Sequence, residues 1–505
     1  MKALGARLPQ IAVLLASAVF ALMFFVTVAP RFVYRYDLDF DEDSILMQSL
    51  RVAQGQPVYV APNADFNPHV YMPLFFWLGG LAIKLVGPSL PPLRAISLAA
   101  TLATTAIICA VARRESERRW LAWACAGLFL GGYRINGFWY DVIRVDSLFV
   151  ALVLGGLAVA VYAGRSRPRL VLAAVLLALS FLTKQTGLGV GVGLGVYLLA
   201  TTGRRAWWFI LPLLGLSLAP IFALNIATHG WFFYHVFTIG SADPIEFGRG
   251  VNYVLFDVFG VMLALSLMAL LAALLELRRS RLNFWRAQPW LLCVLMAVII
   301  SGLGRVRVGG NLNNRMPAYA LLCLAPALLV RSVRGQPEPW ASLKSTTLPV
   351  SPVARWSPWA LAGAIVLQFG LGAYNPLRYI PTAEMRQAGD GLVARIAVVP
   401  GPVLVMMHPY YALLAGKEPS TQIATLWYVR ERGALPVPAD FEKRIETHYY
   451  AAIITDQSDF ETEPAMHGLL TSYYVQSAAL DSTQAPATLV GVVVRPELLY
   501  QPRLR

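Results

Sequence analysis

The stretch Asp37-Leu38-Asp39-Phe40-Asp41-Glu42-Asp43 places five carboxylates within seven residues, shortly after a long apolar segment. Like charges at this density repel one another, so the cluster needs a cation, a proton or a cationic partner. Most of the surrounding chain is apolar or basic. This acidic segment therefore decides how the rest of the sequence is interpreted, and it is the first candidate for a functional site.

The composition indicates a polytopic membrane protein. Of the 505 residues, 57% are hydrophobic and 14% are charged, whereas soluble domains are roughly 45–50% apolar and about 25% charged. The formal net charge is +14, but the basic residues lie between apolar segments. This distribution is typical of the positively charged cytoplasmic loops of membrane proteins, so we predict no nucleic-acid partner.

A membrane-spanning helix needs about 20 apolar residues. The candidate spans are 10–29, 93–112, 120–137, 147–163, 169–183, 186–202, 206–227, 253–275, 288–304, 316–331 and 357–374.

The four cysteines all lie inside apolar segments, so we predict no disulfide.

The segment 71–87 is ambiguous because it is short and contains Pro73 and Lys84. If it does not cross the membrane, the arginine-rich loops between the other spans all face the cytoplasm, as membrane proteins prefer. We therefore predict an interfacial or re-entrant helix there. The resulting topology has about eleven spans, a cytoplasmic N-terminus and an outward C-terminus.

The predicted organisation has two parts. Residues 1–374 form a helical membrane domain with an outer acidic loop at 30–92, and residues 375–505 form a small α/β domain on the outer face. In this tail the residue pattern predicts strands and helices in alternation. The expected strands are 402–407, 450–455 and 488–495, and the expected helices are 382–397 and 408–416. The stretch 335–356, rich in Pro and Ser, is interpreted as a flexible cytoplasmic loop.

The acidic segment is expected to begin a helix. Apolar residues from Ile45 to Val52 have helical spacing, and Gly55 suits the end of a helix. This amphipathic helix would lie on the membrane, with its carboxylates at the N-terminus, where the helix dipole favours anions. The alternative is a solvated helix whose acids act only as caps.

A further carboxylate, Asp146, stands where the chain re-enters the membrane. It could complete a cation site or hold an acceptor hydroxyl. The alternative is an N-cap, with Asp141 paired to Arg144. Another acid, Asp257, lies within a span, where ionisable groups are usually functional; the sequence does not identify its partner.

Outward cations could bind a phosphate at headgroup depth. Lys184 interrupts an apolar run at its outer turn, and either contacts a phosphate or extends to the interface. The loop 304–315 contains Arg305, Arg307 and Arg315, which break the positive-inside rule. Anionic lipid headgroups are one explanation for these arginines, and a phosphate leaving group is the other. His69 is a further candidate for contact with substrate.

These motifs resemble the GT-C superfamily of membrane glycosyltransferases, in particular enzymes similar to protein O-mannosyltransferases and aminoarabinose transferases. The resemblance covers roughly residues 10–330. It rests on Asp41-Glu42, Gly55, Pro57-Val58-Tyr59, Tyr71-Met72-Pro73-Leu74-Phe75-Phe76, Arg94, Asp146, Phe181-Leu182-Thr183-Lys184-Gln185 and Arg315-Met316-Pro317-Ala318-Tyr319.

The resemblance implies an inverting transfer of sugar from a polyprenyl-phosphate donor to a hydroxyl of a lipid, glycan or protein. Asp41 matches the catalytic base, Glu42 assists it or binds a metal, and Asp146 is the second carboxylate. A divalent metal, Mg or Mn, would bind Asp41, Glu42 and Asp146. The extra acid Asp43 leaves open which carboxylate is the base. The residues expected to bind substrate are Asp43, His69, Tyr71, Arg94, Lys184, Arg305, Arg307 and Arg315.

The sequence therefore predicts a glycosyltransferase of a bacterial inner membrane, with membrane lipids around its helices and the tail 375–505 in the periplasm. One alternative is a transporter or flippase for lipid-linked saccharides, although transporters usually have repeated halves and charges near the midplane. The other alternative is a non-enzymatic scaffold for envelope assembly.

Overall fold

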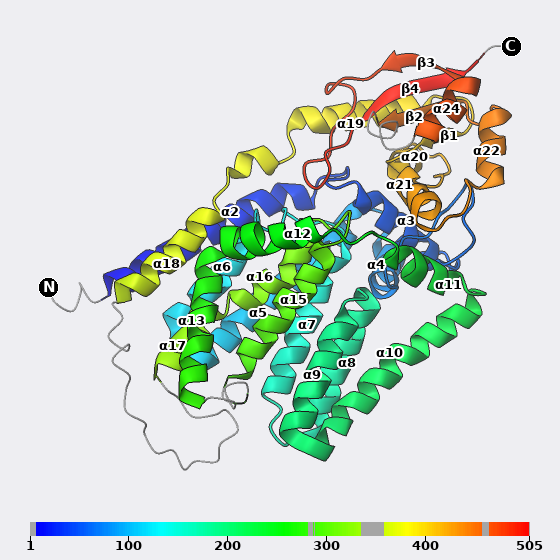
Figure 1. The fold of residues 1–505 in the computed structure, drawn as a ribbon. Helices are drawn as coiled ribbons and strands as arrows, with labels where there is room; N and C mark the ends of the chain where they lie inside the picture. The colour runs from blue at the N-terminus through cyan, green and yellow to red at the C-terminus, as the bar shows by residue number, and fades with distance from the viewer. Residues whose placement is uncertain (1–6, 281–285, 287, 335–357, 457–463, 504–505) are drawn as a thin grey trace.

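The computed structural model describes residues 7–280, 286, 288–334, 358–456 and 464–503. Most of these residues are helical, and the C-terminal part contains a four-stranded sheet. Figure 1 shows long helices gathered in one layer, with the C-terminal part of the chain against one end of them. The loop predicted at 335–356 lies outside the described residues.

Each predicted span overlaps a helix of the structure, but the span 120–137 runs past the end of its helix at Gly131. In chain order the helices of this part are α2 (Leu8–Phe32), α3 (Asp41–Ala53), α4 (Leu74–Val86), α5 (Leu90–Ser116), α6 (Arg119–Gly131), α7 (Val145–Val161), α8 (Arg167–Thr183), α9 (Gly187–Thr202), η1 (Gly203–Ala206), α10 (Trp207–Ala227), α11 (Trp231–Phe233), η2 (Tyr234–Ile239), α12 (Phe247–Asn252), η3 (Tyr253–Val261), α13 (Leu263–Ser280), α15 (Pro289–Arg305), η5 (Leu312–Arg315), α16 (Met316–Leu322), α17 (Ala325–Arg334) and α18 (Pro358–Leu371).

The helices support an integral membrane protein, and the number of crossings stays a prediction. Among the described residues, 4 helices are long and apolar enough to cross a membrane, or up to 6 if each bent pair counts as one span. Several other predicted spans fall on shorter apolar helices. Helix α4 has 13 residues, which is about 20 Å of helix against a hydrocarbon layer of about 30 Å. Its length agrees with the interfacial or re-entrant helix predicted at 71–87.

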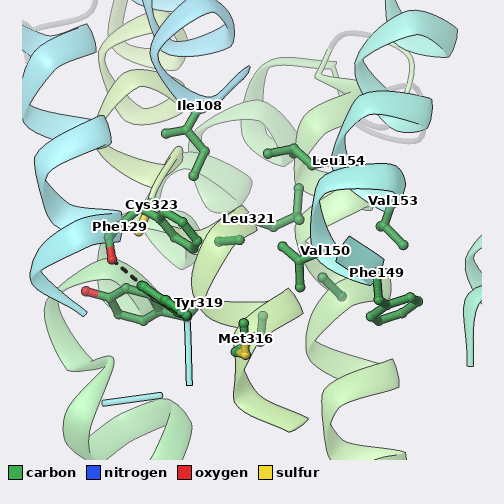
Figure 2. Close-up of a cluster of buried hydrophobic side chains, with 14 of the residues drawn as sticks. Ile108, Phe129, Phe149, Val150, Val153, Leu154, Met316, Tyr319, Leu321 and Cys323 are labelled. Carbon is green, nitrogen blue, oxygen red and sulfur yellow. Dashed lines mark hydrogen bonds between the residues drawn. The ribbon is translucent and has the colours of Figure 1, made fainter. Parts of the chain in front are cut away.

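The helical part has a continuous apolar core around α16, in which every residue is buried. Figure 2 shows part of this cluster, where Tyr319 and Leu321 of α16 lie among apolar side chains from neighbouring helices. The Tyr319 hydroxyl donates to the carbonyl of Leu128, 2.8 Å away, at the end of α6. The four cysteines are free, as predicted, and three of them are buried.

The C-terminal part is a small α/β unit. Its sheet has the order β1-β2-β4-β3, with β1 parallel to β2 and the other two pairs antiparallel. The division predicted after residue 374 falls between α18 and this unit, and stays a prediction. The elements are η7 (Pro376–Tyr379), α19 (Ala383–Ala397), β1 (Val403–Val405), α20 (Pro409–Leu414), α21 (Ile423–Trp427), η8 (Tyr428–Arg432), α22 (Ala439–Glu446), β2 (Ala452–Asp456), α24 (Pro464–Tyr473), β3 (Tyr474–Ala479) and β4 (Pro496–Pro502).

The predicted strands at 402–407 and 450–455 are confirmed, and the one at 488–495 is wrong. That apolar run precedes β4 and forms no strand. Its backbone N–H groups at Leu489 and Val490 donate instead to the carbonyl of Leu38, at 2.9 and 3.0 Å. The run has the composition of a strand, but it covers the acidic segment instead of joining the sheet.

We predict that Gly132→Ala destabilises the helical core. A Cβ on Gly132 would clash with the Tyr319 ring, and overpacking of this kind costs about 1–3 kcal/mol. Thermal unfolding in detergent should therefore begin at a lower temperature. Gly215→Ala on α10 is the matched control, because its Cβ would meet nothing within 4 Å; equal unfolding temperatures for both variants would contradict the packing described here.

Candidate functional site

Helix α3 begins at Asp41, as the sequence predicts, and its first-turn acids are buried. It does not lie as an open amphipathic helix on the membrane. Residues 41–49 are all buried, and α3 packs against α4 on one side and α20 of the C-terminal unit on another. The carboxylates are therefore enclosed, and each needs partners from the protein.

Glu42 has its hydrogen-bonding capacity filled by the protein. Its oxygens accept from the Nε and Nη2 of Arg94, at 2.9 and 2.6 Å, and both side chains are fully buried. They also accept from the backbone N–H groups of Leu38 and Ile143. Arg94 donates in addition to three carbonyls at residues 31, 34 and 36. This pair fixes the backbone on both sides of the acidic segment.

Arg144 connects three carboxylates. Its guanidinium lies 2.6 Å from Asp39, 2.8 Å from Asp41 and 3.7 Å from Asp146. The indole of Trp139 stacks near the same guanidinium and donates to Asp39 at 2.7 Å. The alternative pairing of Asp141 with Arg144 is wrong: Asp141 pairs with Arg31 of α2 and accepts from Tyr133.

The network continues from Asp146 toward the cationic loop. The Nζ of Lys184 lies 2.7 Å from Asp146 and 3.1 Å from the Oδ1 of Asn314. The amide of Asn313 donates to both oxygens of Asp146. Asp146, at the start of α7, thus holds the end of α8 and the loop before α16 together.

The predicted phosphate-binding arginines have protein partners. Arg305 and Arg315 both pair with Asp257, at 2.8 and 2.5 Å, and this identifies the partner of that acid. Their side chains keep exposed fractions of 16% and 13%, so both remain reachable by a ligand. Arg307 donates to the carbonyls of Ser241 and Asp243.

Asp41 is the most exposed of the five acids in the segment. Its side chain is 8% exposed, whereas those of Asp39 and Glu42 are fully buried. Burial raises its pKa, but Arg144 and His69 outweigh burial and lower the pKa to about 2. His69 lies 3.6 Å from Asp41 and stacks on Tyr71. Asp41 is therefore an ionised carboxylate beside an aromatic wall.

The predicted metal set of Asp41, Glu42 and Asp146 does not fit a shared cation. The two oxygens of Glu42 already accept four hydrogen bonds, which come from Arg94 and from backbone N–H groups. The guanidinium of Arg144 occupies the space between the other two acids.

A polar cavity of about 720 Å³ lies beside the acidic segment, between α3 and the C-terminal unit. It is lined by Ser44, Gln48 and Arg51, which share one face of α3 with Asp41, and by Asn67 and Gln422 from other segments. Several of its buried polar atoms, including both amide atoms of Asn67 and the Oε1 of Gln48, have no partner among the described residues. Such a lining suits a ligand rich in hydroxyl groups.

Sequence reasoning missed several members of this network, namely Arg144, Asn313, Asn314 and the whole C-terminal contribution. An arginine between two predicted outward acids, at 144, was the available signal. The Asn-rich run at 311–314 was a second signal. Nothing in the sequence indicated that the tail would cover the acids.

The comparisons with known proteins rest on structure alone. No protein-family model matches the chain, and no curated protein matches it in sequence. The crystal structure of ArnT from Cupriavidus metallidurans in the apo state matches with a TM-score of 0.54 at 14% identity, covering 96% of this chain and 97% of ArnT. The same ArnT bound to undecaprenyl phosphate matches with a TM-score of 0.54 at 13% identity, over the same shares of the two chains.

A second solved protein has the same arrangement. The Archaeoglobus fulgidus oligosaccharyltransferase in the apo form matches with a TM-score of 0.51 at 10% identity, covering 92% of this chain and 73% of that protein. These likenesses show a shared fold. The chain therefore has the helical membrane-protein fold of these two solved proteins.

We predict that Arg94→Met strongly destabilises the protein, because it leaves Glu42 buried without its cation. Breaking a buried ion pair in this way costs about 3–5 kcal/mol. The double variant Glu42→Gln, Arg94→Met should recover part of that loss, as measured by thermal unfolding in detergent. A single variant as stable as the wild type would show that this pair does not hold the segment.

Proposed function

We propose that the protein is an integral-membrane glycosyltransferase that transfers a sugar from a polyprenyl-phosphate donor to an acceptor hydroxyl, with inversion. One observation carries the proposal: the ionised Asp41 and Lys184 belong to one continuous network. That network ends at Asn314, in the loop that also carries Arg305 and Arg315. The steps of that network run from Asp41 to Arg144, then Asp146, Lys184 and Asn314. The shared fold with ArnT, which has been solved bound to undecaprenyl phosphate, supports the same class of donor.

The leaving phosphate needs positive charge at headgroup depth. Lys184, Arg305 and Arg315 supply it, and their exposed fractions of 12–16% leave each able to contact a ligand. Their pairing with Asp146 and Asp257 keeps them fixed and compensated before the donor binds. Preorganised cations of this kind stabilise the charge that develops on a leaving group.

Asp41 acts as the base for the acceptor hydroxyl. Its low pKa keeps it ionised at neutral pH but makes it a weak base. The proton therefore moves late, when the new C–O bond is largely formed and the hydroxyl has become acidic. Arg144 orients the carboxylate, Glu42 and Arg94 position its helix, and the rings of His69 and Tyr71 form the wall beside it.

The acceptor enters through the polar cavity beside α3. Ser44, Gln48 and Arg51 follow Asp41 along one helical face, so a hydroxyl-rich ligand in the cavity points one end toward the base. The two amide atoms of Asn67 and the Oε1 of Gln48, which have no partner among the described residues, suit the hydroxyls of a glycan or of a glycolipid headgroup. Asp43 and Arg307 do not line this cavity.

The membrane assignment follows from the apolar helices. We propose a multi-pass protein of a bacterial inner membrane, with the N-terminus in the cytoplasm and residues 375–505 in the periplasm. The C-terminal unit and the acidic segment share one side, because Gln422 donates to the carbonyl of Phe40 and Arg444 pairs with Asp65. Positive loops on the opposite side agree with this orientation.

We predict that Asp41→Asn abolishes sugar transfer while the protein remains folded. Loss of a general base lowers the rate by about 10²–10⁴-fold, and Arg144 keeps Asp39 and Asp146 as partners. Transfer is measured in detergent with envelope lipid extracts as the source of donor and acceptor. Asp481→Asn, at an exposed carboxylate of the C-terminal unit, is the control; an active Asp41→Asn protein would refute the assignment of the base.

We predict that Lys184→Met weakens binding of undecaprenyl phosphate. A hydrogen bond to a charged group is worth about 1.5–3 kcal/mol, which corresponds to a loss of about tenfold to a hundredfold in affinity. Binding is measured with the purified lipid in detergent micelles, together with the thermal unfolding of each variant. The control is Lys84→Met on α4, an exposed lysine; unchanged affinity in a folded Lys184→Met protein would exclude this phosphate site.

A further inference from the structure

A second set of ionisable groups lies under the C-terminal unit. Among the described residues, Asp37, Asp43 and His408 form a group whose ligand atoms all lie within 4.8 Å of one another. All three side chains are buried. Two of them come from the acidic segment, on either side of Asp41, and the third directly precedes α20. The group therefore joins two parts of the chain that are far apart in sequence.

His408 is oriented as metal-binding histidines are. Its Nε2 lies 3.0 Å from the carboxylate of Asp456 on β2, and its Nδ1 lies 2.7 Å from Asp37. A carboxylate that accepts from one ring nitrogen leaves the other nitrogen available as a ligand. A metal ion bound by Nδ1 would displace the proton that otherwise lies between His408 and Asp37.

Asp43 has a buried carboxylate oxygen without a partner among the described residues. It is fully buried, and its Oδ1 receives no hydrogen bond from the described residues. Its Oδ2 accepts only a long hydrogen bond of 3.3 Å from the backbone N–H of Tyr410. A divalent ion would supply the missing partner and neutralise the carboxylates of Asp37 and Asp43.

We propose that Asp37, Asp43 and His408 bind a divalent transition-metal ion, Zn²⁺, which fastens the C-terminal unit onto the acidic segment. An imidazole with two carboxylates favours Zn²⁺ over the hard ions Mg²⁺ and Ca²⁺. Zinc bonds of about 2.0–2.2 Å place tetrahedral donor atoms about 3.3 Å apart, so small side-chain adjustments close the set. Either carboxylate can complete the coordination with its second oxygen.

The ion has a positioning role. It fixes residues 37 and 43, so the turn that carries Asp41 is held at both ends. The site differs from Asp41, Glu42 and Asp146, which arginines already neutralise. The proposal does not depend on glycosyl transfer, because a zinc-binding protein that transfers no sugar would refute only the proposed function.

The test uses the full chain, purified in detergent and stripped with a chelator. Zn²⁺, Mn²⁺ and Mg²⁺ are titrated separately, with bound metal measured by elemental analysis and stability by thermal unfolding. We expect about one Zn²⁺ per chain and a higher unfolding temperature, as binding to the native state requires. His408→Gln and Asp43→Asn should lose the ion, whereas the matched controls His448→Gln and Asp481→Asn should keep it.

Asp456→Asn provides a graded measurement. Loss of the carboxylate that supports a metal-binding histidine lowers the metal affinity by about 10–100-fold. Stripped wild-type protein that binds no zinc overturns the proposal, whether or not the variants fold. Equal zinc binding by His408→Gln, or uptake of Mg²⁺ alone, also overturns it.

Discussion

One guanidinium, that of Arg144, is shared by three buried carboxylates, and the rest of the site depends on this arrangement. Asp39, Asp41 and Asp146 lie too close together to remain ionised in an apolar setting without a cation. Arg144 lies just before α7 and is held by the stacked Trp139. The acids are therefore compensated by a group that cannot leave, which keeps Asp41 charged while water is largely excluded.

The second constraint is the cover over the acidic segment. Backbone groups at 489 and 490 donate to Leu38, and Gln422 donates to Phe40. The C-terminal unit thus donates hydrogen bonds to the turn before α3, where the carbonyls of Leu38 and Phe40 would otherwise lack these partners. Figure 1 shows this unit against the end of the helical layer that carries α3 and α4. The site is consequently built from both ends of the chain.

Local features were predictable from sequence, and long-range pairing was not. The apolar segments, the helix that starts at Asp41 and the two strands at 402–407 and 450–455 follow from composition and period. The partners of Glu42 and Asp257 depend on which helices meet, so Arg94 and Arg315 were recognised as cations without their acids. The run at 488–495 has a strand's residues, but its position over Leu38 is a tertiary effect that overrides β-propensity.

The central claim is that Asp41 and the cations at 184 and 305–315 border one reaction centre. A structure of the protein bound to a non-transferable polyprenyl-phosphate sugar analogue tests it most directly. The account predicts the phosphate against Lys184 and Arg305 or Arg315, with the Asp41 carboxylate on the opposite face of the anomeric carbon, leaving room for a hydroxyl at about 3 Å. A phosphate bound elsewhere, with the sugar out of reach of Asp41, would contradict it.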